Sequence, residues 1–195
     1  YGLIMPALAI LYRQQQKYGQ AERIMLRALD INRAHGNVMG IRSYLSDDLA
    51  TLARLYIDMQ RYDDAIARFN ESIELQLQGG TAPSQLLWKY AGRATAYHEQ
   101  GELEQAQADL SVAIGLAEQE HGQLSGGDVE RSQSFGSYNE IYEHMVALQF
   151  ERDDLDAAWD AIERGRARGL FDQLAAQGVE LFSGMPRTEA DRLRQ

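Results

Sequence analysis

The chain has 195 residues, of which 45% are hydrophobic and only three are proline, and its formal net charge is −10. This composition excludes a disordered segment, because the chain has enough apolar surface for a continuous core. The negative charge argues against a protein that coats nucleic acid or an anionic membrane, and the lack of cysteine excludes disulfides and thiolate chemistry within these residues.

Apolar and small residues recur at helical spacing along the chain, and valine is rare while Leu, Ala, Glu, Gln and Arg are abundant. These residues favour helix over strand, and no alternating strand pattern is present. We therefore expect an all-helical chain whose third helix is re-capped at Ser46-Asp47. In chain order, the expected helices span about residues 6–16, 19–35, 39–59, 64–78, 85–100, 104–120, 129–151 and 155–177.

The stretch from Leu49 to Leu75 has the clearest pattern, since it contains two helical faces joined by a short polar turn. Isolated helices of this length are marginal in water, so such a hairpin must stack on similar hairpins to bury its apolar faces. The residues expected to be buried are Leu49, Leu52, Ala53, Tyr56, Ala65, Phe69, Ser72 and Ile73.

The pattern of this hairpin is repeated before and after it. In each copy, the tyrosine of the first helix is followed nine residues later by the first alanine of the second helix. The pattern resembles the tetratricopeptide repeat (TPR), a helix-turn-helix unit, over residues 5–115. Because the tyrosines Tyr12, Tyr56 and Tyr97 are 44 and 41 residues apart, the resemblance is to long-helix TPR variants. The three copies carry Leu8, Ala9, Tyr12, Ala21, Met25 and Ala28; Leu52, Ala53, Tyr56, Ala65 and Phe69; and Ala94, Tyr97, Ala106, Leu110 and Ala113.

A fourth, divergent pair is expected at 129–177. Ala158 occupies the position of the first alanine of the second helix, and Gln149 occupies the position of the tyrosine. The resemblance implies an all-α fold, a right-handed superhelical solenoid of about four antiparallel helix pairs. We expect the array to span residues 1–177, with 178–195 as a linker or the start of a following element. The pairs are expected at about 5–36, 39–78, 85–121 and 129–177.

The second helix of the fourth pair carries another resemblance. Its E-R-x-R-A-R-x-L-x-D-x-L run, with the Leu181-Phe-Ser-Gly-Met-Pro stretch after it, looks like the segment that precedes the catalytic domain in the CHAT family of TPR-associated caspase-like proteins. A peptidase of that kind needs a Cys and a His, and this chain has no Cys. The residues that carry the resemblance are Glu163, Arg164, Arg166, Ala167, Arg168, Leu170, Asp172 and Leu174.

Catalytic, metal and cofactor sites are not expected, and we interpret the chain as non-enzymatic. The four histidines are scattered and none shows the i, i+4 spacing of paired metal ligands. The acid pairs Asp47-Asp48, Asp63-Asp64 and Asp153-Asp154 fall where helices are expected to start, so they are interpreted as caps rather than as catalytic or cation-binding carboxylates. Acidic residues interleave Arg164, Arg166 and Arg168, which favours a solvated or interdomain salt-bridged face over a nucleic-acid site.

The resemblance to TPR arrays implies that the first helix of each pair lines a concave groove that binds a protein or peptide. Trp88 is the first choice as an anchor, because a large aromatic outside the core pattern is typical of interfaces. Lys and Asn of the peptide-carboxylate clamp are absent, since Ala50, Arg54, Ala91 and Thr95 occupy those places. The candidate groove residues are Arg13, Arg54, Ile57, Asp58, Trp88, Thr95, His98, Glu140 and Glu143.

Two functions remain open from the sequence. One is a cytoplasmic interaction scaffold with a protein or peptide partner, without nucleic acid, membrane or cofactor. The other is the regulatory arm of a CHAT-type protease, packed in cis against a catalytic domain that is not in this chain. A Cys and a His in a caspase-like fold downstream of Gln195 would favour the second function.

Overall fold

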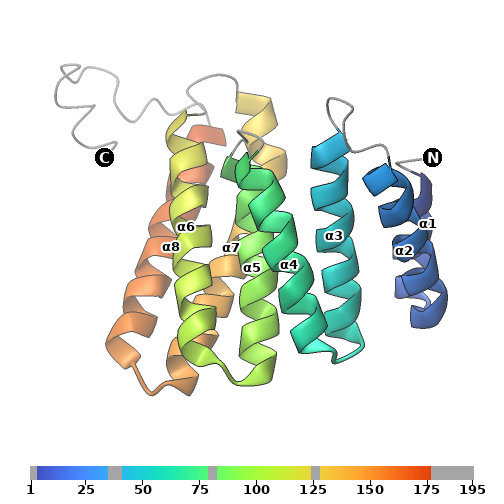
Figure 1. Cartoon of the computed structure of the whole chain (residues 1–195). Helices are drawn as coiled ribbons and strands as arrows, with labels where there is room; N and C mark the ends of the chain where they lie inside the picture. The colour runs from blue at the N-terminus through green and yellow to red at the C-terminus, as the bar shows by residue number, and fades with distance from the viewer. Residues whose placement is uncertain (1–3, 35–40, 79–82, 124–127, 177–195) are drawn as a thin grey trace. The chain divides into compact units, whose positions relative to one another are not determined.

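A computed structural model describes residues 4–34, 41–78, 83–123 and 128–176, and its secondary structure is entirely helical there. The helices form about four antiparallel pairs, so the predicted all-α fold is confirmed (Figure 1). Much of the predicted loops at 79–84 and 123–128, and the predicted linker at 178–195, lie outside the described residues. The eight helices are α1 (Ile4–Gln14), α2 (Tyr18–Ala34), α3 (Ile41–Asp58), α4 (Tyr62–Gln78), α5 (Pro83–Gln100), α6 (Leu103–Gln123), α7 (Asp128–Glu151) and α8 (Leu155–Ala176).

The chain divides into two compact units, residues 1–113 and 114–195. In the first unit α2 packs on α3, and α4 packs on α5, so that each hairpin is followed by the next as the stacking argument requires. In the second unit α7 and α8 pack against each other. Of the described helices, none combines the length and the apolar content that crossing a membrane requires.

The turns inside the four pairs share one backbone geometry. Gln16, Gln60, Gly101 and Asp153 all have a positive φ, at 58°, 57°, 85° and 57°. At each turn the next amide donates to a carbonyl five residues back, as Arg61 N does to Tyr56 O at 2.8 Å. This is the Schellman arrangement that ends a helix in a left-handed residue. Asp154 N bonds in the same way to Gln149 O, so the fourth pair uses the same turn with glutamine in the place of tyrosine.

Replacing Gln60 by glycine is expected to raise the free energy of unfolding of the first unit by about 0.5–1 kcal/mol. A side chain at φ 57° is strained, and glycine relieves that strain at some cost in unfolded-chain entropy. Urea unfolding followed by Trp88 fluorescence, in a Trp159→Phe background, measures the change in this unit. Gln60→Ala is the control, since alanine keeps the strain; a glycine variant no more stable than the alanine variant would contradict the prediction.

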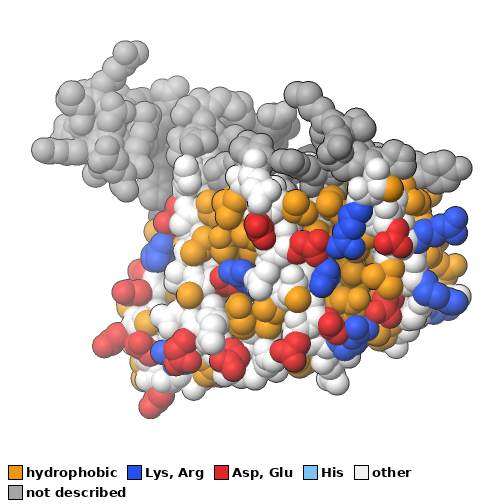
Figure 2. Space-filling view, in the orientation of Figure 1, with side chains coloured by type: hydrophobic (Ala, Val, Ile, Leu, Met, Phe, Trp, Pro, Cys, Tyr) orange, Lys and Arg blue, Asp and Glu red, His pale blue; other side chains and the backbone are white. Residues whose placement is uncertain are grey.

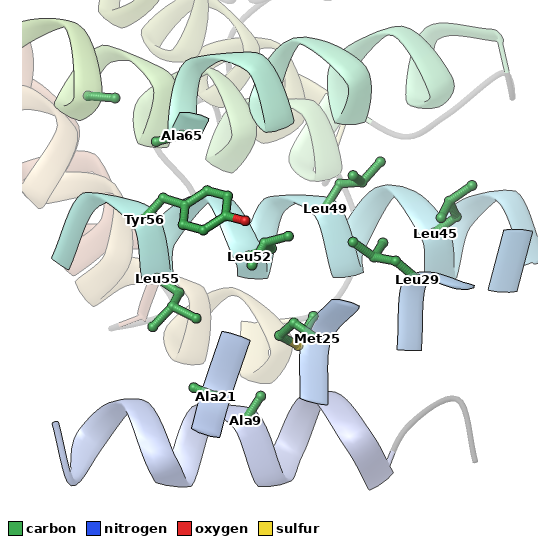
Figure 3. Packing of buried hydrophobic residues seen from close by; sticks show 11 residues of the cluster. Ala9, Ala21, Met25, Leu29, Leu45, Leu49, Leu52, Leu55, Tyr56 and Ala65 are labelled. Atoms are coloured by element: carbon green, nitrogen blue, oxygen red, sulfur yellow. The ribbon is translucent and has the colours of Figure 1, made fainter. Parts of the chain in front are cut away.

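The core of the first unit confirms the hairpin pattern (Figure 3). Every residue expected to be buried between Leu49 and Ile73 is buried, and Leu52, Ala65 and Phe69 are fully so. Met25 and Leu29 of α2 join this cluster against α3. Leu8 differs, because 40% of its surface is exposed although it holds the repeat position of Leu52. In the described residues α1 has only α2 and α3 as neighbours, so the outer side of Leu8 stays uncovered.

The ring of Phe69 fills the space left by a missing side chain on α5. A Cβ placed on Gly92 would lie 2.5 Å from Phe69 Cζ and 2.8 Å from Cε1, far inside van der Waals contact. Gly92 therefore lets α5 approach α4 closely over a fully buried aromatic ring.

The prediction that α3 is re-capped at Ser46-Asp47 is wrong, because α3 runs unbroken from Ile41 to Asp58. Ser46 is fully buried and exchanges hydrogen bonds with Ser72 of α4, with Ser46 Oγ donating to Ser72 O at 2.8 Å. Asp48 is also buried and accepts a hydrogen bond from Asn32 Nδ2 of α2 at 2.6 Å. These polar groups satisfy one another between helices, and such pairing lets polar residues occupy a helix interior.

The two other acid pairs lie at helix starts, as expected. Asp63 and Asp64 are in the first turn of α4, where carboxylates complement the helix dipole. At the start of α8, Asp154 Oδ1 accepts a hydrogen bond from Ala157 N at 3.0 Å, which is the geometry of an N-cap.

The second unit has its own small core. Gly165 of α8 faces the Cβ of Tyr142 on α7, at 3.3 Å from a Cβ built on the glycine. Arg164 of α8 and Tyr142 both reach Glu118 of α6, at 2.7 and 3.2 Å. The buried apolar residues of this unit include Ile141, Tyr142, Met145, Leu148, Ala158 and Ala161.

Candidate protein-binding face

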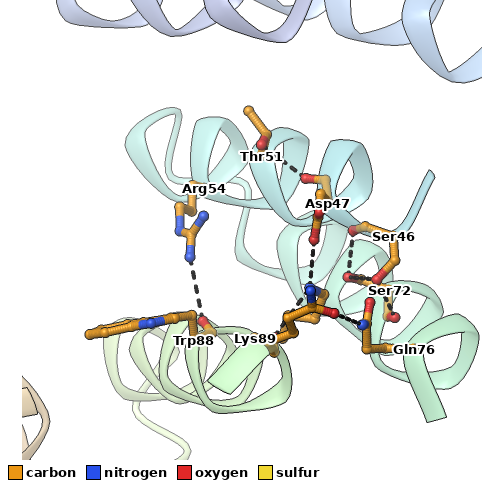
Figure 4. A network of polar contacts seen from close by, with 9 residues as sticks. Ser46, Asp47, Thr51, Arg54, Ser72, Gln76, Trp88 and Lys89 are labelled. Atoms are coloured by element: carbon orange, nitrogen blue, oxygen red, sulfur yellow. Dashed lines mark hydrogen bonds and ion pairs between the residues drawn. The ribbon is translucent and has the colours of Figure 1, made fainter. Parts of the chain in front are cut away.

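Two polar residues on α3 face two residues on α5, and together they form the α3–α5 face: Asp47, Arg54, Trp88 and Lys89 (Figure 4). Asp47 and Arg54 are seven residues apart and thus on one side of α3. Lys89 is only 4% exposed, and its Nζ donates to Asp47 Oδ1 at 2.8 Å and to Gln85 O at 3.2 Å. A buried ammonium group that is paired and hydrogen-bonded in this way holds the two first helices in register.

Arg54 is the cation at the middle of the α3–α5 face. Its Nη2 donates to the backbone carbonyl of Trp88 at 3.5 Å, a long hydrogen bond. Burial lowers the pKa of Arg54, the nearby charge of Arg13 lowers it further, and Asp47 partly offsets both. Arginine ordinarily titrates far above neutral pH, so the guanidinium is treated as a cation.

Arg13 and Asp58, both candidate residues, form a bidentate ion pair between α1 and α3. Arg13 Nε lies 2.6 Å from Asp58 Oδ2, and Nη2 lies 2.9 Å from Oδ1. Both side chains are partly exposed, at 34% and 26%. A bidentate pair of this kind holds the two first helices side by side, and the two charges neutralise each other.

The other candidate residues have different environments. Ile57 packs against the core clusters of the first unit, so part of its side chain serves the fold. Thr95 Oγ1 donates to Ala91 O one turn earlier on α5, and His98 is half-buried near the end of α5. Glu140 and Glu143 are exposed on α7 in the second unit. Glu143 lies at a hollow of about 540 Å³ between α7 and α8, lined mainly by apolar atoms.

Several charged side chains outside the α3–α5 face form ion pairs with one another. On the face shown in Figure 2, basic side chains lie among acidic and hydrophobic ones. Arg61 contacts both Glu22 and Asp64 at 2.7 Å, and Glu71 contacts both Arg33 and Arg68 at 2.7 Å. Exposed pairs of this type contribute little stability.

Sequence reasoning missed Asp47 and Lys89 as residues of this face. Asp47 was interpreted as a cap, although its spacing of seven from Arg54 was available as a signal. Lys89 follows Trp88 directly, and only the approach of α3 shows that its long side chain turns inward to Asp47.

Nothing in the described part of the chain assembles a metal site, since no three His, Asp or Glu side chains gather there. In the segment that resembles the approach to a CHAT domain, Arg164 pairs with Glu118 and Arg166 lies 3.6 Å from Glu163. These contacts are compatible with the expected solvated or salt-bridged face, and the side chain of Arg168 lies outside the described residues. The relation to CHAT proteins stays a prediction.

Comparison with known proteins supports the repeat interpretation. Residues 7–35 and 49–78 match the family model described as tetratricopeptide repeat, and these segments contain most of α1 to α4. A comparison with curated proteins found no match.

Solved structures share the fold at low sequence identity. BtubC (BKLC) from P. vanneervenii is 16% identical with a TM-score of 0.68, over 87% of this chain and 63% of that one. A variant of a Podosopora anserina putative kinesin light chain with nearly identical TPR-like repeats is 16% identical with a TM-score of 0.62, over 97% and 89%. A second structure of those repeats is 14% identical with a TM-score of 0.53, over 93% and 96%.

Identity at this level shows the fold alone. The chain spans 63% of the length of BtubC, the first of these structures. Residues 7–35 and 49–78 thus match the tetratricopeptide repeat model, and the chain folds as an all-α arrangement of about four antiparallel helix pairs that is similar to the TPR-like repeats of these structures.

Proposed function

We propose that the protein is a non-catalytic interaction module that binds a peptide or partner domain along the first helices of its pairs. TPR domains generally bind proteins, which supports the class of function. We further propose that residues 1–177 act as one array of four pairs, with residues 178–195 leading into a following element. The candidate face within that array is the α3–α5 face, with Arg13, Asp58 and His98 beside it.

The observation that carries the proposal is the combination of Arg54 and Trp88 on adjacent first helices. Neither residue is part of the repeat pattern, and neither is among the buried residues of the core. Aromatic and arginine side chains are enriched among the few residues that dominate binding energy. A half-buried tryptophan beside a half-buried guanidinium offers both apolar contact and directional donors.

Changing Arg54 to Gln and Trp88 to Ala together is expected to abolish retention of partners in affinity capture. The double change removes the charge and the aromatic surface of the α3–α5 face while leaving the helical circular dichroism signal intact. Loss of hot-spot residues typically costs about 2 kcal/mol or more each, which corresponds to a loss of binding well beyond tenfold.

The matched control is the double variant Arg27→Gln and Trp159→Ala. Both of these residues are exposed, on α2 and α8, so the control removes one arginine and one tryptophan elsewhere. Equal retention of the same proteins by both double variants would place the binding site away from the α3–α5 face.

A further inference from the structure

Among the described residues, the buried and partly buried cations of the first unit differ in whether a carboxylate contacts them. Arg13, Lys89 and Arg93, which are all partly or fully buried, each contact a carboxylate within 3 Å: Asp58, Asp47 and Asp109. Arg54 is comparably buried, yet among the described residues no carboxylate lies within ion-pair distance of it. Its one hydrogen bond goes to a neutral backbone carbonyl at 3.5 Å.

The acids on the same side of α3 as Arg54 already contact other cations. Asp58 is held by both nitrogens of its fork with Arg13, and Asp47 is held by Lys89. Removing a cation from water without a counter-charge is costly, and the cost is recovered only if an anion approaches. Arg54 therefore carries unused donors and a positive charge that Asp47 only partly offsets, on a face that contains an aromatic residue.

We infer that Arg54 receives a carboxylate side chain, Glu or Asp, from the bound segment of a protein partner, with Trp88 contacting the residue next to it. This inference rests on the proposed function and names the chemistry of its partner. Charge complementarity selects the occupant, because the guanidinium fork of Arg54 matches a carboxylate and contacts only a neutral carbonyl among the described residues.

The net charge of the chain limits what else that segment contains. A protein of net charge −10 repels a polyacidic peptide at long range. A segment with one acid among apolar or basic residues meets Arg54 without that penalty. The recognised carboxylate belongs to a side chain within such a segment, since the Lys and Asn that hold a chain terminus are absent here.

The test uses the full chain and a synthetic library of peptides that are acetylated at the N-terminus and amidated at the C-terminus, so that each carries one carboxylate, on a Glu side chain. The tightest binders are resynthesised with Gln in place of Glu. Fluorescence anisotropy of labelled peptides then gives Kd for the wild type and for Arg54→Gln, Arg54→Lys and Arg27→Gln.

The expected result is that Glu→Gln in the peptide weakens binding to the wild type about tenfold or more, as loss of a charged hydrogen bond does. The same peptide change has little effect on Arg54→Gln and an intermediate effect on Arg54→Lys. Arg27→Gln, which also removes one arginine charge, behaves as the wild type. Raising the salt concentration reduces the difference between the Glu and Gln peptides.

The outcomes separate this inference from the proposed function. The carboxylate assignment would be overturned if peptides bind the wild type equally well with Glu or Gln. It would also be overturned if Glu→Gln in the peptide weakens binding to Arg54→Gln by the same factor as binding to the wild type. Either result would leave the interaction function standing. If no peptide of the library binds at millimolar concentration, the assignment of an acidic segment is overturned. The proposed function is then still supported if the wild type captures a folded partner and the Arg54 and Trp88 double variant does not.

Discussion

Replacing Gly92 by alanine is expected to destabilise the first unit by about 1–2 kcal/mol, even though alanine is the better helix former. The new Cβ would lie 2.5 Å from Cζ of Phe69, and that ring is fully buried and has no free space to move into. Overpacking of this kind typically costs about 1–3 kcal/mol, and it outweighs the gain of about 1 kcal/mol in helix propensity.

Urea unfolding monitored by Trp88 in a Trp159→Phe background measures this effect. Gly19→Ala is the matched control, because a Cβ there meets no atom within 4 Å, and it is expected to be neutral or stabilising. Phe69→Leu, which removes part of the ring, should cost less in the Gly92→Ala background than in the wild type. Stabilisation by Gly92→Ala equal to that by Gly19→Ala would show that α4 and α5 are not in this close contact.

The sequence predicted the buried positions that recur in each hairpin. It did not predict contacts that occur in only one hairpin. Leu52, Tyr56, Ala65 and Phe69 recur at fixed spacing because each hairpin must bury the same face, and all four are buried. The role of Gly92 could not be predicted, because the contact that requires glycine comes from a ring 23 positions earlier in the chain. Periodicity gives the side of a helix on which a residue lies, but not the shape of its neighbour.

The candidate site was predicted as a set of residues and not as a set of contacts. Arg13 and Asp58 were chosen separately, and the structure joins them in a bidentate pair across 45 positions of sequence. Asp47 and Asp48 were interpreted as caps because acids often precede helices. They lie inside α3 instead, where partners from α2 and α5, distant in sequence, satisfy them. Such partners are set by packing between helices, which local sequence does not encode.

Asp48→Asn is expected to remove a pH dependence from the stability of the first unit. Burial raises the pKa of Asp48 to about 6 despite the opposing hydrogen bond from Asn32, and the neighbouring charge of Asp47 adds to the rise. Because the folded-state pKa is above the unfolded value of 3.8, the folded protein binds the proton more tightly. The wild type is therefore expected to lose about 1–3 kcal/mol as the pH rises from about 4 to above 6.

The asparagine variant keeps a carbonyl oxygen to accept the Asn32 hydrogen bond and has no charge to bury, so its stability should lack this decline. At pH 7.5 it is expected to be more stable than the wild type by about 1–2 kcal/mol, and near pH 4 the two should converge. Urea unfolding of the first unit at a series of pH values measures the difference between the variant and the wild type. Asp30→Asn, which removes an exposed carboxylate of α2, is the control and should follow the wild type. If the free energy of unfolding differs between Asp48→Asn and the wild type by a constant amount from pH 4 to 7.5, Asp48 does not titrate in this range. The prediction would then be wrong.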